Sequence, residues 1–171
     1  MKTLIVYYSR TGTTEKLARA LADALDARVA TIDCPRYAVE RSGCLGYLKA
    51  GWDSLKGRLP QIDTPPLTLA DYDLLLIGTP IWTSYPSAPM RAFLEQGVGF
   101  PPRVALFVTS GGHSPAEKAA EMVKDLLPVP LEAMLSVGQS KVLANDFDAD
   151  VRDFVRGLQS QPAEVEQRSV S

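Results

Sequence analysis

The sequence predicts an open α/β fold, in which a parallel sheet carries helices on both faces. Five apolar runs alternate with five helical patterns along the chain, and this alternation is typical of parallel sheets with crossover helices. The runs at 74–77 and 104–108 are continuously apolar, as strands buried on both faces are. Because ligands of such sheets bind outside the carboxyl ends of the strands, the loops after the strands are the candidate site.

Length and composition limit the classes of protein. The 171 residues suffice for one domain with a sizeable core, which we expect over residues 1–160, with a polar tail over 161–171. A net charge of −2 gives no argument for nucleic acid, and no apolar run reaches the roughly 20 residues that cross a bilayer. Without a signal-peptide layout, and with Cys34 and Cys44 expected as free thiols, we expect a cytoplasmic protein that binds neither nucleic acid nor membranes. The single His excludes a His-rich metal site, and we expect no metal.

The first half of the chain contains two strands and two helices. The apolar run at 3–8 predicts a strand, and apolar residues four apart at 13–26 predict a helix. Residues 28–32 are rich in Val, Ile and Thr and predict the second strand. At 45–59, apolar residues recur at steps of three and four, which predicts a crossover helix of about four turns with Trp52 in the core. Its flanking loops cover a ligand, form a subunit contact or only connect, and the sequence leaves this open.

The second half repeats the pattern of strand, loop and helix three times. Prolines and glycines separate the apolar runs, and such residues punctuate secondary structure. The expected elements are a strand at 72–77, a turn-rich loop at 78–86, a helix at 87–96, a strand at 103–109, a helix opened by a capping box at 114–117 and closed by Pro128, a strand at 131–137 and a helix from 148.

The loop between the first strand and the first helix is a candidate anion site. Its residues are Ser9, Arg10, Thr11, Gly12, Thr13 and Thr14. Four of the six carry hydroxyls, Gly12 lets the backbone approach a ligand, and the positive end of the helix faces the same point. The loop lacks the Lys of a triphosphate-binding loop and the three glycines of dinucleotide folds. We therefore predict a bound phosphate monoester, with Arg10 either adding charge to the phosphate or pointing to solvent.

Two later loops lie at carboxyl ends of strands and are expected to converge on the first. Trp82 is either a plug between helix and sheet or a ring that stacks on a ligand, and its polar, Pro-bounded surroundings favour stacking. Tyr85 either stacks or lines the mouth. His113 is either a solvated residue or a proton donor. The candidate residues are Thr79, Pro80, Ile81, Trp82, Thr83 and Ser84 in one loop, and Thr109, Ser110, Gly111, Gly112 and His113 in the other.

These loops resemble those of the flavodoxin family over about residues 1–160. Residues 9–14 fit the family's Ser/Thr-x-Thr-Gly-x-Thr phosphate loop. The stretch Gly-Thr-Pro-Ile-Trp at 78–82 is similar to the loop that lays an aromatic ring against the isoalloxazine, and 109–113 is similar to the loop that holds the pyrimidine edge. The resemblance implies a sheet of five parallel strands in the order 2-1-3-4-5, FMN as the cofactor, and the candidate residues of all three loops as its ligands.

The resemblance implies two alternative functions. The Gly-Thr-Pro segment also resembles flavodoxin-fold quinone reductases, which implies an oxidoreductase that passes electrons from NAD(P)H to a quinone-like acceptor, with His113 as a catalytic candidate. The alternative is a non-catalytic electron carrier for a redox protein; a homodimer is left open. The nearly neutral charge argues against long-range steering to a partner.

Besides its charge, the chain departs from the family's shuttle proteins in the turn after Trp82, and this difference also favours the enzyme. Shuttle proteins of the family place a Gly beside the stacking aromatic, where a peptide flips when the flavin takes one electron. Here Thr83 and Ser84 follow Trp82, and positive φ is costly for both. We therefore expect mainly two-electron chemistry.

Overall fold

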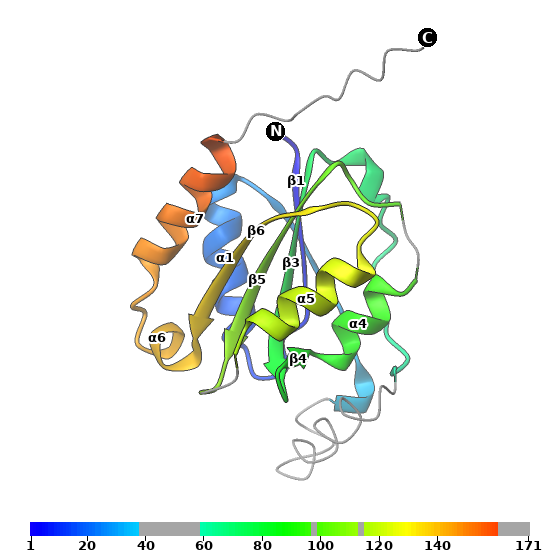
Figure 1. Cartoon of the computed structure of the whole chain (residues 1–171), viewed down its shortest axis with the longest axis horizontal. Helices are drawn as coiled ribbons and strands as arrows, with labels where there is room; N and C mark the ends of the chain where they lie inside the picture. Colours follow the sequence, from blue (N-terminus) through cyan, green and yellow to red (C-terminus); the bar gives the residue numbers. More distant parts are fainter. Residues whose placement is uncertain (38–58, 97–98, 113–114, 161–171) are drawn as a thin grey trace.

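A parallel sheet lies between two layers of helices (Figure 1). The structure is a computed structural model, and it describes residues 1–37, 59–96, 99–112 and 115–160. Neighbouring strands of the main path are all parallel, and their order is β2-β1-β3-β5-β6. This order confirms the expected 2-1-3-4-5 arrangement once the short β4 is set aside. The strands are β1 (Thr3–Tyr7), β2 (Arg28–Thr31), β3 (Leu74–Trp82), β4 (Tyr85–Pro86), β5 (Arg103–Ser110) and β6 (Leu131–Gly138).

The helices cover the sheet on both faces (Figure 1). One apolar cluster joins the sheet to the helices labelled α1, α6 and α7. A second cluster joins the other face of the sheet to α4 and α5. The helices are α1 (Thr13–Leu25), α4 (Ala88–Leu94), α5 (Glu117–Leu126), α6 (Gln139–Leu143) and α7 (Asp148–Ser160), with short 3₁₀ turns η1 (Pro35–Tyr37) and η2 (Leu69–Asp71).

The central strands are apolar throughout because each face of the sheet is covered. In β3, Leu74 and Leu76 pack into the cluster with α1 and α7, whereas Leu75 and Ile77 pack into the cluster with α4 and α5. All four side chains are fully buried. Successive residues of a strand point to opposite faces, so a strand between two helical layers needs apolar residues at every position.

The structure differs from the expectations in three places. Residues 78–82 continue β3 rather than forming a loop, and β4 pairs antiparallel with the end of that strand. The helix α5 begins at Glu117, with Ala116 as an N-cap that makes no side-chain capping bond, whereas Ser114, on which the expected capping box depends, lies outside the described residues. The helix α6 was not expected. The predicted crossover helix, Cys44, Trp52 and the tail at 161–171 lie outside the described residues.

The described ranges contain neither a membrane-crossing helix nor a metal-holding cluster. No helix there combines the length and apolar character needed to cross a bilayer. The same ranges contain no group of three His, Cys, Asp or Glu side chains placed to hold a metal ion.

We predict that Gly78→Ala destabilises the fold. Gly78 pairs with Tyr7 and Phe107, and a Cβ there would lie 2.1 Å from Cζ of Phe107. Overpacking of this kind costs about 1–3 kcal/mol, to be measured as the free energy of unfolding in urea. The matched control is Gly157→Ala in α7, where a Cβ meets nothing within 4 Å and removal of a helical glycine stabilises by about 0.5–1 kcal/mol. Equal effects of the two changes would contradict the packing argument.

Candidate functional site

Four strand ends meet in one pocket of about 120 Å³. The strands of the main path run in the same direction, so their carboxyl ends lie at one edge of the sheet, the lower edge in Figure 1. The residues that line the pocket come from the loop after β1 and the start of α1, from the end of β3, from the end of β5, and from α6. They are Ser9, Arg10, Thr11, Thr13, Thr14, Pro80, Ile81, Trp82, Thr109, Ser110, Gly111 and Gln139.

The structure thus brings eleven of the candidate residues together, and others lie elsewhere. Thr79 is fully buried and its hydroxyl lies 3.0 Å from that of Ser87, so it fastens β3 to the start of α4. His113 is outside the described residues. The remaining candidates, Gly12, Thr83, Ser84 and Gly112, do not line the pocket.

The loop after β1 has the chemistry of an anion cradle. Gly12 has φ +85° with open space around it, a backbone conformation that favours glycine. It turns the chain into α1, where the N–H groups of Thr13, Thr14 and Glu15 have no hydrogen-bond acceptor within the described ranges. The hydroxyl of Ser9 accepts from the N–H of Gly12 at 3.1 Å and keeps its own proton to donate. None of the described residues that line the pocket carries a carboxylate, so no negative side chain among them repels an anion.

A buried hydroxyl pair joins two of the loops. Oγ1 of Thr14 lies 2.7 Å from Oγ1 of Thr109, and both residues are almost fully buried. One hydroxyl donates to the other, which fixes the start of α1 against the end of β5. Thr14 therefore has a structural contact in addition to its place in the pocket lining.

Trp82 combines the two roles considered for it. Its indole makes edge-to-face contacts with Tyr8 and Tyr37, with ring centroids 5.7 and 5.2 Å apart, and it packs against the core cluster. It also lines the pocket. Edge-to-face packing of this kind holds an aromatic ring in one orientation, so the pocket has a fixed aromatic wall.

Arg10 is held at the pocket and does not simply extend into solvent. Its Nε donates to the carbonyl oxygen of Tyr37 at 3.2 Å. The side chain is half-buried and lines the pocket. The backbone of η1 thus positions a guanidinium beside the hydroxyl-rich loop.

Burial keeps the hydroxyl of Tyr8 and the thiol of Cys34 in their protonated forms. Burial raises the pKa of the Tyr8 hydroxyl far above its ordinary value, and the nearby Cys34 adds to the shift. Burial likewise raises the pKa of the Cys34 thiol, which lies 3.6 Å from the carbonyl oxygen of Gln61. Both groups stay protonated and neutral at physiological pH, so neither provides a base.

The turn after Trp82 corrects the expectation that Thr83 and Ser84 avoid positive φ. Their φ angles are 50° and 72°, because a two-residue connection between Trp82 and its partner Tyr85 requires left-handed backbone at both positions. The hydroxyl of Thr83 donates to the carbonyl oxygen of Trp82 at 2.7 Å. Strained backbone costs about 1–3 kcal/mol per residue. The missing glycine therefore no longer argues for two-electron chemistry.

Gln139 is a pocket residue that the sequence argument missed. It opens α6 directly after Gly138, which pairs with Ser110 across β5 and β6. Its Oε1 lies 3.2 Å from the position that a Cβ on Gly111 would take. The rule used for the other loops, that ligands bind at carboxyl ends of strands, would have found it if applied to the expected strand at 131–137.

The chain belongs to the flavodoxin family, because a family model described as Flavodoxin matches residues 2–143. It is 33% identical over 111 residues to an NAD(P)H dehydrogenase (quinone) of Cupriavidus metallidurans, a match covering 65% of this chain and 54% of that protein. The matched stretch thus spans about half the length of that relative.

Solved structures show the same fold. A flavoprotein of Lactobacillus acidophilus in complex with FMN is 26% identical, with a TM-score of 0.68 over 84% of this chain and 97% of that one. The apo form of the flavoprotein from that organism is 29% identical, with a TM-score of 0.60 over 78% of this chain and 91% of that one.

We predict that Thr14→Val and Thr109→Val each lower the free energy of unfolding by about 1–3 kcal/mol, because each leaves a buried hydroxyl without its partner. The double variant should lose less than the sum of the two, since it removes both groups. Urea unfolding of the four proteins measures this coupling. Thr31→Val, at an exposed position of β2, should change stability by no more than about 0.5 kcal/mol. Strict additivity of the two buried changes would show that the pair does not couple the loops.

Proposed function

We propose that the pocket binds FMN and that the protein is an oxidoreductase that passes electrons from NAD(P)H to a quinone-like acceptor. The observation that carries the proposal is the pocket itself, in which a hydroxyl-rich loop without carboxylates adjoins the fixed indole of Trp82. A phosphate monoester attached to a flat ring needs both features. Membership of the flavodoxin family and the FMN complex of the similar flavoprotein support this choice of ligand.

The residues present fit the phosphate end of this cofactor. The leading N–H groups of α1 and the hydroxyls of Ser9, Thr11 and Thr13 would hold the phosphate, with Arg10 adding a positive charge. A volume of about 120 Å³ is below the roughly 300–1,000 Å³ of pockets that enclose a whole ligand. The pocket therefore suits the phosphate and its neighbouring polar groups.

The remaining lining residues would position the ring. Trp82 would contact its flat face, and the amide of Gln139 would donate or accept hydrogen bonds at its polar part. When bound, the flavin supplies reversible acceptance of hydride or electrons. Trp82 is the one aromatic residue in the described lining, and the loop after β5 contributes the small residues Ser110 and Gly111. Among these residues, no second aromatic ring would cover the other face of the flavin, so that face is left open to a flat substrate.

The choice of an enzyme over an electron carrier rests on two observations. The relatives named NAD(P)H dehydrogenase (quinone) are 33% and 34% identical over the matched stretch. The net charge of −2 gives little electrostatic steering toward a protein partner. We infer small-molecule partners, an NAD(P)H donor and a quinone-like acceptor, and we place the reaction in the cytoplasm. A role for His113 as proton donor to the acceptor belongs to the same proposal.

Steady-state oxidation of NADH and NADPH by the FMN-loaded protein, with and without benzoquinone, tests this function. We expect oxidation that depends on both FMN and quinone. We expect His113→Ala to lower kcat by about 10²-fold in protein that is saturated with FMN. Lys124→Gln, at an exposed position of α5, is the control and should leave kcat unchanged.

Failure to oxidise either nicotinamide while FMN remains bound would contradict the enzyme and favour the electron carrier. An unchanged kcat in His113→Ala would remove that residue from the chemistry. Both results are readable separately, because FMN binding is measured on the same samples.

A further inference from the structure

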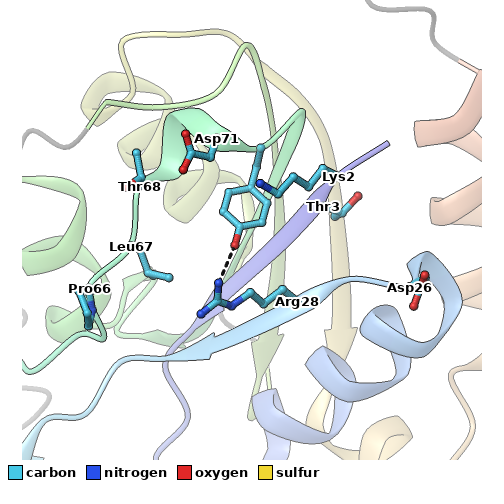
Figure 2. A pocket seen from close by; sticks show the side chains of 9 residues that line it. Lys2, Thr3, Asp26, Arg28, Pro66, Leu67, Thr68 and Asp71 are labelled. Atoms are coloured by element: carbon cyan, nitrogen blue, oxygen red, sulfur yellow. Dashed lines mark hydrogen bonds between the residues drawn. The ribbon is translucent and has the colours of Figure 1, made fainter.

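A second cavity, of about 390 Å³, lies at the opposite edge of the sheet (Figure 2). It adjoins the amino-terminal ends of β1 and β2 and the segment that leads through η2 into β3. The five residues of β1 separate this edge from the FMN pocket by about 17 Å. The cavity is within the size range of small-molecule sites and is separate from the site described above.

Two cations converge on one tyrosine in this cavity. Nη1 of Arg28 donates to the hydroxyl of Tyr72 at 3.2 Å, and Nζ of Lys2 lies 4.8 Å from the centroid of the same ring. Tyr72 is 7% exposed, so the ring is a fixed point for both. Because the Tyr72 oxygen accepts from Arg28, its own proton remains available to donate.

Neither cation forms a salt bridge among the described residues, although the Asp73 carboxylate lies at the backbone of Lys2. In the parts of the chain that the structure describes, the ion pairs do not include Lys2 or Arg28. Asp26 and Asp71 also line the cavity, but Figure 2 shows their carboxylates set apart, on opposite sides of Lys2 and Arg28. The two positive groups therefore lie together at Tyr72, apart from these two carboxylates.

The position of Lys2 is fixed although it is near the start of the chain. Its backbone N–H donates to a carboxylate oxygen of Asp73 at 2.5 Å, and its carbonyl oxygen accepts from the N–H of Asp73 at 2.8 Å. This pairing holds the Cα of Lys2 at the edge of the sheet. The ammonium group is thus kept within reach of the cavity, at a small cost in backbone entropy on binding.

The cavity also has an apolar wall. Pro66 and the half-buried Leu67 line it beside the cations. A site of convergent polar groups next to apolar side chains is typical of small organic ligands rather than of free ions. The carboxylates of Asp26 and Asp71 in the lining disfavour an extended polyanion such as nucleic acid.

We propose that this cavity binds a small organic anion, with its carboxylate or phosphate group held by Lys2, Arg28 and the Tyr72 hydroxyl and its apolar body against Leu67. Charge-assisted hydrogen bonds from a guanidinium, an ammonium and a phenol all favour an oxyanion. Such a ligand would also relieve the repulsion between two cations that face the same ring.

The test uses the full chain saturated with FMN, so that the other anion site is occupied. Benzoate, phenyl phosphate, acetate and benzyl alcohol are titrated separately while backbone amide signals are followed by NMR. We expect saturable shifts at Lys2, Arg28 and Tyr72 with benzoate or phenyl phosphate, and the tighter of the two identifies the anionic group. Acetate should bind more weakly because it lacks the apolar body, and benzyl alcohol should not bind because it lacks the charge.

Variants assign the binding to the cluster. Lys2→Gln and Arg28→Gln should each raise the Kd by about tenfold or more, the usual effect of losing a charged hydrogen bond. Arg152→Gln, at an exposed position of α7, is the matched control and should leave Kd unchanged. Thermal unfolding of each variant shows that it is folded. The variant Tyr72→Phe keeps the ring and removes the hydroxyl, so it isolates the contribution of that hydroxyl to the Kd.

Four results would overturn the proposal. Shifts that do not saturate would show that no site exists. Equal binding of benzyl alcohol and benzoate would show that the cations do not select the ligand, and equal binding of acetate and benzoate would remove the apolar wall. An unchanged Kd in both Lys2→Gln and Arg28→Gln would place any binding elsewhere.

Discussion

The close contact between Gly78 and Phe107 is the constraint on which the rest of the structure depends. Tyr7, Gly78, Phe107 and Leu135 lie opposite one another across four parallel strands, and the ring of Phe107 occupies the space over Gly78. This row fixes the register of the sheet. The register in turn decides which residues stand at the carboxyl ends, and these residues form the pocket.

The pocket is built from rigid parts rather than from loops alone. The hydroxyl pair of Thr14 and Thr109 fastens α1 to β5, and two tyrosines hold the indole of Trp82. The left-handed turn at Thr83 and Ser84 lies outside the residues that line the pocket. An anion cradle and an aromatic wall are therefore preorganised, which lowers the entropy lost when a ligand binds.

Much of this could be predicted from sequence, because strands covered on both faces leave a continuous apolar signal. The runs at 74–77 and 104–108 are such strands, and their order fixes which loops meet. The extension of β3 could not be predicted, since Gly78 and Pro80 are residues that normally interrupt strands. In the structure the carbonyl oxygen of Pro80 accepts from the N–H of Ser87 at 3.1 Å, so its backbone faces away from β5 and its missing N–H removes no bond to that strand. The left-handed turn at Thr83 and Ser84 was missed for a similar reason, since such turns favour Asn and Gly.

The relative affinity of the protein for FMN and riboflavin tests the central claim most directly, and quenching of flavin fluorescence measures both. The two ligands share the ring and differ in the phosphate, so the ratio of their Kd values isolates the cradle at residues 9–14. Because each charge-assisted hydrogen bond contributes about 1.5–3 kcal/mol and a tenfold change in Kd corresponds to about 1.4 kcal/mol, we expect FMN to bind at least about 100-fold more tightly. Equal affinity for the two ligands would contradict the account.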